Sequence, residues 1–252
     1  SNTATHSNTT RPGDRMLLVG LTGGVACGKS TTLRLVGAHP HCALLDLDAL
    51  YHQLVRDGEG PLLGPLRQAF GEQVVVGQEQ DGQLSLRLDR QALGQLVFHS
   101  EEARKKLNQL THPAIFKELV KKLLWHWLIG TRIVIVESPL LFETKGLRSL
   151  CQHTVVVYTP PELQLQRLLL RNPNLTEEEA LLRIKSQMSL ETKRELATLV
   201  IDNSGDLEHL QVEVDRVLHT LQRSSRWWLW NSGLILLPVL LAVLWLLFSL
   251  LW

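Results

Sequence analysis

A glycine-rich loop near the start of the chain constrains its fold more than any other feature. Gly23, Gly28, Lys29 and Ser30 form a Gly-x-x-x-x-Gly-Lys-Ser pattern that follows the apolar run 16–21. In this pattern the glycines let backbone amides approach a ligand, the lysine reaches nucleotide phosphates, and the serine hydroxyl is a ligand for Mg²⁺. The residues expected to bind phosphate are Gly23, Gly24, Val25, Ala26, Cys27, Gly28, Lys29, Ser30 and Thr31. A chance glycine turn is the alternative, and the complete pattern between a strand and a helix argues against it.

The order of apolar runs and helical patterns predicts an α/β fold of the P-loop NTP hydrolase type, with a five-stranded parallel sheet. Strands are expected at residues 16–21, 42–45, 133–137, 154–158 and 199–201. Ligands of such sheets bind beyond the carboxyl ends of the strands, so Asp46, Asp48 and Glu137 are expected near the phosphate loop. Residues two apart at a strand end face opposite ways, so we expect only one of the two aspartates, Asp46 and Asp48, to enter the site directly. Glu137 is in the position where P-loop kinases hold a group that orients Mg²⁺ or its water shell.

Two helical regions interrupt the expected sheet. Residues 49–124 are predicted to be a mostly helical insertion. Its helices are expected at residues 49–55, 65–70, 89–98, 101–110 and 113–124. Residues 162–196 contain two further helical patterns, 162–171 and 176–196, joined at an Asn-Pro-Asn segment, with Arg167 and Arg171 on one face of the first. Thr176, with Glu179 three residues later, is expected to form a capping box at the start of the second. This arrangement predicts a lid that closes on phosphates, although a surface salt bridge accounts for either arginine equally well.

The two ends of the chain differ in composition from the domain expected at residues 16–223. Residues 1–15 are polar and are expected to be disordered. Residues 227–252 contain no charged residue, are rich in leucine, and have tryptophans near both ends. This length and pattern predict a transmembrane tail anchor, with the preceding arginines on the cytoplasmic side. A buried hydrophobic helix or hairpin is the alternative.

The overall charge and the cysteines argue against nucleic-acid binding and against a cysteine-based metal or disulfide site. A formal net charge of +1 gives no indication of nucleic-acid binding. The three cysteines, Cys27, Cys42 and Cys151, are widely spaced, which disfavours both a metal site and a disulfide framework. Nothing in the sequence defines a protein partner.

The motifs taken together resemble the dephospho-CoA kinase family over roughly residues 16–221. They are the phosphate loop, Asp46-Leu47-Asp48, Leu88-Asp89-Arg90, Val97-Phe98, Thr111-His112-Pro113-Ala114-Ile115, Pro139-Leu140-Leu141-Phe142-Glu143, Gln164 with Arg167, Gln187, and Ile201-Asp202-Asn203-Ser204-Gly205. Within the family, the hydrophobic tail and the residues 143–145 and 153–158 are most similar to the animal members.

This resemblance implies transfer of the γ-phosphate of ATP to the ribose 3′-hydroxyl of dephospho-CoA, with Mg²⁺ as cofactor. By position, Asp48 acts on the acceptor hydroxyl, and Lys29 and Arg167 serve the transferred phosphate. The remaining residues that it implies are Ser30 and Glu137 for the metal, Arg171 in the lid, Asn203 and Gly205 near adenine, and His112 for the acceptor. The family usually has Asp where Glu137 stands, and commonly Gly-Ser in place of Ala26-Cys27.

Two other functions stay open from the sequence. One is a different small-molecule or nucleotide kinase of the same fold, which competition between acceptors would distinguish. The other is a nucleotide-binding membrane scaffold with little catalysis, for which Asp48→Asn would leave the cellular function unchanged. The expected location is the cytoplasmic face of an intracellular membrane, either the mitochondrial outer membrane or the endoplasmic reticulum, with a mitochondrial location as the alternative.

Overall fold

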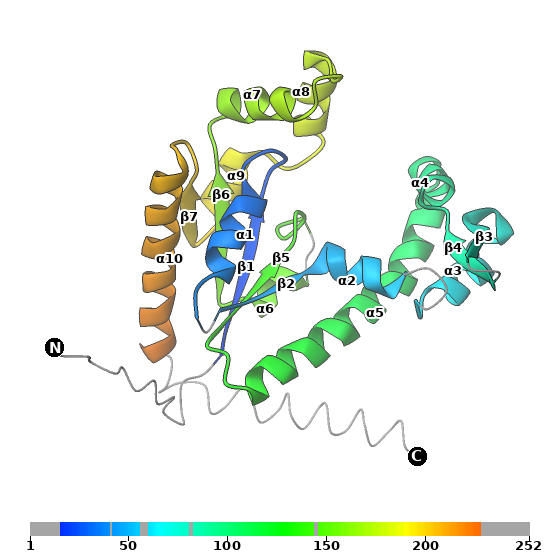
Figure 1. The fold of residues 1–252 in the computed structure, drawn as a ribbon, viewed down its shortest axis with the longest axis horizontal. Helices are drawn as coiled ribbons and strands as arrows, with labels where there is room; N and C mark the ends of the chain where they lie inside the picture. The colour runs from blue at the N-terminus through cyan, green and yellow to red at the C-terminus, as the bar shows by residue number, and fades with distance from the viewer. Residues whose placement is uncertain (1–15, 41, 56–59, 81–82, 144–145, 228–252) are drawn as a thin grey trace. The chain divides into compact units, whose positions relative to one another are not determined.

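The structure is a computed structural model that describes residues 16–40, 42–55, 60–80, 83–143 and 146–227 (Figure 1). It divides into two compact units. Unit 1 comprises Ser1–Leu44, His126–Ile135 and Pro139–Trp252, and unit 2 comprises Leu45–Trp125 and Val136–Ser138. The predictions for residues 1–15 and 228–252 therefore lie outside the described residues. Within the described ranges, no helix has both the length and the apolar character needed to cross a bilayer.

A five-stranded parallel sheet with the order β2-β5-β1-β6-β7 forms the centre of unit 1, and the ends of β2 and β5 pass into unit 2. The strands are β1 (Leu17–Gly23), β2 (Cys42–Asp46), β5 (Ile133–Glu137), β6 (His153–Tyr158) and β7 (Leu199–Asp202). Thr22 of β1 lies opposite Val156 of β6, and Val156 lies opposite Val200 of β7. Every residue of β1 and β5 is buried, as expected for central strands covered on both faces. The predicted five-stranded parallel sheet is confirmed.

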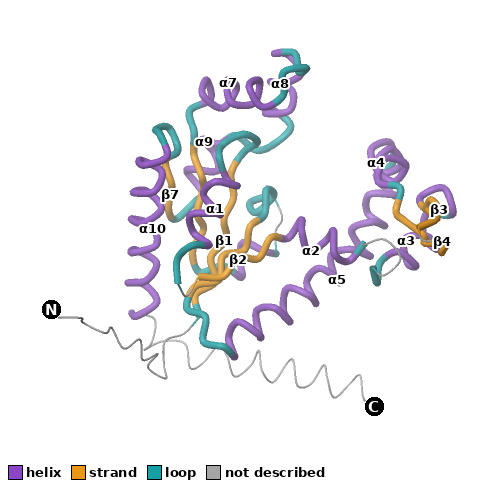
Figure 2. The backbone as a smooth tube through the Cα atoms, viewed as in Figure 1, coloured by secondary structure: helices purple, strands orange, loops and turns teal. Residues whose placement is uncertain are grey.

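Six helices of unit 1 are described, and Figure 2 shows their paths. They are α1 (Lys29–Gly37), α6 (Leu147–Leu150), α7 (Pro161–Arg171), α8 (Glu177–Lys185), α9 (Leu190–Leu196) and α10 (Leu207–Trp227). Helix α10 packs against α1 and β7, and its Leu210, Val214 and Leu221 join the core of the sheet. The single helix predicted for residues 176–196 is wrong, because the helix ends after Lys185 and the Ser189 hydroxyl caps a new one by accepting from the Thr192 amide.

Unit 2 has its own core beneath an antiparallel hairpin and several helices. Its elements are α2 (Leu47–Leu54), α3 (Leu63–Phe70), the 3-10 turn η1 (Glu72–Val74), β3 (Val75–Gln80), β4 (Gln83–Leu88), α4 (Arg90–His99) and most of α5 (Glu101–Leu128). The prediction of two helices at residues 101–124 is wrong, since α5 continues through Pro113. Proline costs an interior helix about 3 kcal/mol. Here Leu107, Leu110 and Ile115 on either side of it pack on the same core, and this packing keeps the helix continuous.

Candidate nucleotide-binding site

The glycine-rich loop joins β1 to α1 in a conformation that two residues fix. Ala26 has φ 57° and Gly28 has φ 90°, both in the left-handed region. Gly28 must be glycine for a second reason, because a Cβ there would overlap the side-chain amide of Asn203. The loop therefore takes the backbone course that its sequence predicts, and Ala26 holds a position where glycine would be less strained.

Two glutamine side chains hold the loop from outside. Gln164 of α7 donates from Nε2 to the Val25 carbonyl at 2.8 Å, and its side chain is buried. The Val25 amide donates to Oε1 of Gln187 at 3.1 Å. Gln187 lies in the break between α8 and α9, and this break places its side chain against the loop. Both glutamines belong to the sequence motifs, but neither was given a role there.

The start of α1 is suited to bind an anion. Gly28 is its N-cap, no side chain caps it, and no acidic residue stands in its first turn. Lys29 folds back along the loop, with Nζ 3.1 Å from the Gly23 carbonyl oxygen and 3.5 Å from that of Gly24. Ser30 is exposed in the first turn. Uncapped amides at the positive end of a helix dipole attract phosphate, and Lys29 adds a full charge beside them.

A buried hydrogen-bond network connects the loop to the end of β7. The Cys27 carbonyl accepts from Nδ2 of Asn203 at 2.9 Å and from the Thr159 hydroxyl at 3.2 Å. Arg167 donates from Nη1 to the Asn203 carbonyl at 2.8 Å and reaches the Gly205 carbonyl from Nη2 at 3.5 Å. Asn203 thus binds the loop through its side-chain amide, and its backbone carbonyl accepts a hydrogen bond from Arg167. Thr159 was not predicted as a site residue, although it directly follows a buried strand, and that position is typical of site residues in such sheets.

These groups surround a pocket of about 360 Å³ in unit 1. Its lining residues are Gly28, Thr31, Arg167, Asn203, Gly205, Asp206, Leu207 and Leu210. The volume is within the range of small-molecule sites. Apolar Leu207 and Leu210 beside backbone carbonyls and a guanidinium form a wall suited to a flat heterocycle with polar edges. The structure thus brings Arg167, Asn203 and Gly205 together with the phosphate loop.

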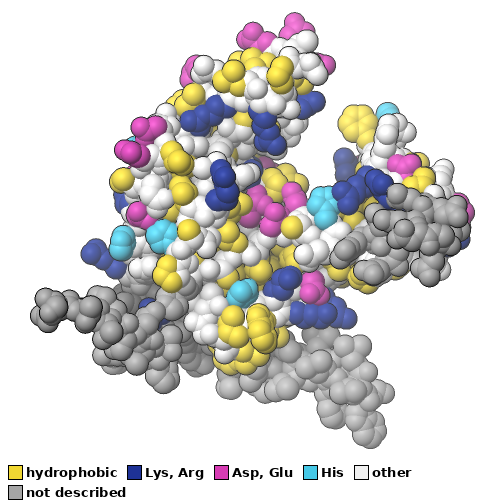
Figure 3. Space-filling view, in the orientation of Figure 1, with side chains coloured by type: hydrophobic (Ala, Val, Ile, Leu, Met, Phe, Trp, Pro, Cys, Tyr) yellow, Lys and Arg dark blue, Asp and Glu magenta, His cyan; other side chains and the backbone are white. Residues whose placement is uncertain are grey.

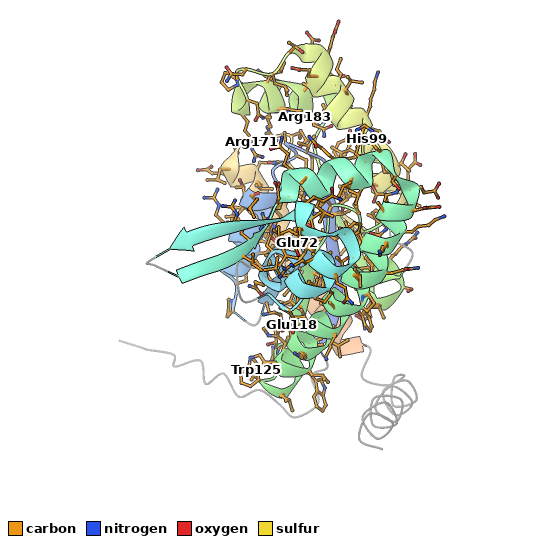
Figure 4. All side chains as sticks on the ribbon, turned by 90° about the vertical axis from the view of Figure 1, so that its right-hand side faces the viewer. Glu72, His99, Glu118, Trp125, Arg171 and Arg183 are labelled. Atoms are coloured by element: carbon orange, nitrogen blue, oxygen red, sulfur yellow. The ribbon has the colours of Figure 1, made fainter. Side chains whose placement is uncertain are left out.

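Arg167 and Arg171 differ in their surroundings although both are on α7. Arg167 is half-buried and bonded to the loop after β7, whereas Arg171 is exposed in the last turn and is not among the pocket's lining residues. Figure 3 shows Lys and Arg side chains on the lower side of α7 and α8, and Asp and Glu side chains on their upper side. Figure 4 labels Arg171 and Arg183 on these two helices. The closing movement predicted for this lid stays a prediction.

The other predicted site residues belong to unit 2. Asp46 is the N-cap of α2 and accepts from the Ala49 amide at 2.9 Å. Asp48 is exposed in the first turn of α2, so the expectation that it stands at a strand end is wrong. Glu137 ends β5 and is buried. His112 is exposed on α5. The structure therefore uses the carboxylate of Asp46 as the helix cap and leaves the side chain of Asp48 exposed.

Lys193 of α9 is a buried cation that the sequence reading missed. Its Nζ donates to the Pro139 carbonyl at 2.7 Å and pairs with Oε1 of Glu143 at 3.1 Å. The same carbonyl accepts from the hydroxyl of Thr22, at the end of β1. Lys193 thus ties the segment after β5 to the strand that carries the phosphate loop. No short motif predicts this contact, because the three segments are far apart in the sequence.

The thiol of Cys27 is enclosed beneath the loop. Burial raises the pKa of this thiol, and the nearby charge of Lys29 opposes the rise only in part. Cys27 therefore stays protonated at neutral pH and acts as a small packing residue. Within the described ranges no three His, Cys, Asp or Glu side chains gather to hold a metal. Mg²⁺ in nucleotide sites takes few protein ligands besides phosphates and water, and the hydroxyl of Ser30 and the carboxylate of Glu137 are each, taken separately, oxygen donors of the kind it prefers.

Comparisons of the sequence and of the structure with known proteins point to one family. The dephospho-CoA kinase family model matches residues 17–209, more than half of the chain. The dephospho-CoA kinase domain-containing protein of Danio rerio is 42% identical over 205 residues, which cover 80% of this chain and 84% of that protein. The dephospho-CoA kinase of Saccharomyces cerevisiae is 37% identical over 213 residues, with coverages of 83% and 85%. The structure of the dephospho-CoA kinase from Campylobacter jejuni is 27% identical, with a TM-score of 0.60, and covers 82% of this chain and 98% of that one.

Proposed function

Because the chain belongs to the dephospho-CoA kinase family, we propose that it transfers the γ-phosphoryl group of ATP to the ribose 3′-hydroxyl of dephospho-CoA. The products are CoA and ADP, and the hydroxyl proton is released. The family relationship that the motifs indicate is confirmed, as is the similarity to an animal member. The observation that supports the proposal most is the phosphate loop, which is held by Gln164, Gln187 and Asn203 beside a nucleotide-sized pocket.

On the donor side, the loop positions phosphates rather than reacting with them. The first-turn amides of α1 and the ammonium of Lys29 bind the β- and γ-phosphates, while Asn203 and Gly205 receive the adenine end in the pocket. When bound, Mg²⁺ neutralises phosphate charge, and Ser30 and Glu137 are the residues that would hold it or its water shell. Arg167 and Arg171 supply positive charge from α7, and this charge stabilises the transferred phosphoryl group.

On the acceptor side, Asp48 is the residue that can accept the proton of the ribose hydroxyl. Its carboxylate is exposed in the first turn of α2 and is not used as the helix cap. A carboxylate positioned at the attacking hydroxyl orients it and takes its proton as the bond to phosphorus forms. His112, exposed on α5, is the residue of unit 2 that we assign to binding of the acceptor.

The test is an assay of the purified full chain in detergent with ATP, MgCl₂ and dephospho-CoA, in which the 3′-phosphorylated product is identified by mass spectrometry. Asp48→Asn is expected to lower kcat by roughly 10²- to 10⁴-fold, as for other general bases, with nucleotide affinity unchanged. Lys29→Ala removes a phosphate contact and is expected to lower kcat/KM by about 10²-fold or more.

Asp46→Asn is the matched control for Asp48→Asn. It makes the same chemical change two residues away, and asparagine caps a helix about as well as aspartate. We expect it to retain most of the activity. Absence of any product from the unsubstituted chain, with ATP binding intact, contradicts the proposed reaction; equal losses in the two asparagine variants contradict only the role of Asp48.

We also propose that residues 227–252 attach the chain to the cytoplasmic face of an intracellular membrane, either the mitochondrial outer membrane or the endoplasmic reticulum. The support is in the sequence: a long uncharged leucine-rich segment bordered by tryptophans and preceded by arginines. After expression of the full chain in cells, alkaline carbonate extraction should leave it in the membrane pellet. Recovery in the supernatant contradicts the attachment, and organelle markers in the same fractions decide between the membranes and the mitochondrial alternative.

A further inference from the structure

The end of α5 exposes a compact group of large apolar side chains. Trp125, Trp127, Leu128 and Ile129, which we call the α5-end patch, are 61%, 51%, 70% and 55% exposed. The division between the two units falls after Trp125, but α5 is continuous through it, so these residues share the last turn of one helix and the residue that follows it. Figure 3 shows hydrophobic side chains gathered over the lower end of α5, and Figure 4 labels Trp125 there.

Basic side chains precede the patch along the same helix. Lys117, Lys121 and Trp125 are spaced four residues apart and therefore lie along one side of α5. Both lysines are exposed, and Lys121 pairs with Glu118 at 3.1 Å. Lysines that precede a tryptophan on one side of a helix are typical of a segment at a membrane surface, where lysine meets anionic headgroups and tryptophan lies at the headgroup level.

The topology of unit 1 shows at which edge of the sheet its three patch residues, Trp127, Leu128 and Ile129, lie. Helix α5 leads into β5, so its last residues lie at the amino-terminal edge of the sheet. The Leu17 amide, at the start of β1, confirms this by donating to the Arg132 carbonyl at 2.7 Å. Helix α10 follows β7, returns along the sheet, and ends at Trp227 on the same edge (Figure 1). The described part of the chain therefore ends at the same edge of unit 1 as Trp127, Leu128 and Ile129, and the phosphate loop lies at the opposite edge.

We propose that the α5-end patch is a second membrane contact, whose tryptophans lie among the headgroups of a bilayer that contains anionic lipid. This inference rests on the proposed attachment through residues 227–252. Two contacts on one edge restrict how the chain tilts on the membrane, which a single anchor does not. The nucleotide pocket, at the opposite edge of unit 1, then faces the aqueous phase, where ATP and ADP exchange freely.

The test uses the full chain with the patch tryptophans as the only reporters. Five tryptophans, Trp227, Trp228, Trp230, Trp245 and Trp252, are replaced by phenylalanine, which leaves Trp125 and Trp127 of the seven. The chain is reconstituted into vesicles of phosphatidylcholine and phosphatidylserine, with or without acyl chains brominated near the headgroup. We expect the brominated lipid to quench tryptophan emission, and kinase activity to show that the reporter chain is folded.

A matched control places the reporter at the opposite edge of unit 1. The two patch tryptophans are also changed to phenylalanine, and Leu182→Trp introduces one tryptophan at a 67% exposed position of α8. Emission from this chain should not respond to bromine, and a response equal to that of the patch overturns the proposal.

The remaining outcomes separate the two membrane claims. A reporter chain that floats with the vesicles but shows no quenching overturns the patch contact and leaves the attachment standing. A chain that does not float overturns both. If residues 228–252 or a second copy of the chain cover the patch, its tryptophans are shielded from acrylamide in detergent as well and bromine has no effect, which also overturns the proposal.

Discussion

Among the described residues of unit 1, the buried charged side chain is that of Lys193. Its side chain is fully buried, with Glu143 and the Pro139 carbonyl as its partners. Glu143→Ala leaves the ammonium with the carbonyl alone. Removing one partner of a buried pair costs 3–5 kcal/mol, and because Glu143 is 26% exposed we expect a somewhat smaller loss, about 2–3 kcal/mol of unfolding free energy, in urea denaturation of the detergent-solubilised chain.

The control for this variant is Glu118→Ala. It breaks the pair between Lys121 and Glu118, which has the same 3.1 Å separation but a largely exposed lysine. Exposed pairs contribute at most about 1 kcal/mol, so the change should be small. Equal losses in the two variants would show that burial does not set the contribution of Lys193.

The thiol of Cys151 makes stability depend on alkaline pH. Burial raises its pKa from 9.0 to about 11. The unfolded chain releases this proton at lower pH than the folded chain, so the contribution is complete below pH 9 and is lost as the pH rises towards 11. Between these values the unsubstituted chain should lose about 2 kcal/mol more stability than Cys151→Ala, measured by urea denaturation at each pH. Parallel pH profiles of the two proteins contradict this assignment.

The sequence predicts side chains that belong to short motifs better than those that act across the fold. Gly28, Asn203 and Arg167 are found by their motifs, and the structure places them around one pocket. Lys193 and Thr159 act through contacts between segments that are distant in the sequence, so no local pattern reveals them. The role of Asp48 as a substrate-facing carboxylate stays a prediction, while its expected strand position is wrong because α2 starts directly after Asp46.

At the scale of elements, strands were predicted more accurately than helix ends. Runs such as 133–137 are apolar because both faces of a central strand are covered, and that signal is local. Helix boundaries depend on tertiary packing instead. Packing keeps α5 continuous through Pro113, and the contact of Gln187 with the Val25 amide coincides with the break between α8 and α9. These two differences show where tertiary contacts override local helix signals.

Helix α8 is the element whose start was predicted in most detail. Thr176 and Glu179 form the expected capping box, with the Glu179 amide donating to the Thr176 hydroxyl and the Thr176 amide donating to the carboxylate. Thr176→Ala removes the cap. It should lower the local stability of the first turn by about 1 kcal/mol, seen as faster amide exchange at residues 177–180. Thr176→Ser keeps the hydroxyl and should retain slow exchange; equally fast exchange in both variants contradicts the role of the cap.

On the scale of the whole molecule, the division into two units has consequences for how ligands stabilise the chain. Each unit has a separate hydrophobic core: one around β1, β6 and α10, and one around α3, α4 and the β3–β4 hairpin. The residues that line the nucleotide pocket belong to unit 1. Binding of a nucleotide therefore raises the free energy that is needed to open unit 1. Opening of the hairpin in unit 2 is a separate local event.

Hydrogen exchange of the full chain, with and without a non-hydrolysable ATP analogue and MgCl₂, measures this difference. At an analogue concentration of about 100 times Kd, linkage adds about 2.7 kcal/mol, so amides that exchange through opening of unit 1 should slow by about 100-fold. Protection is expected at residues 24–37 and 203–210, and little change at residues 75–88. Equal protection of the hairpin would mean that the two cores open together, because binding energy can slow the exchange of a segment only if its opening also disrupts the bound site.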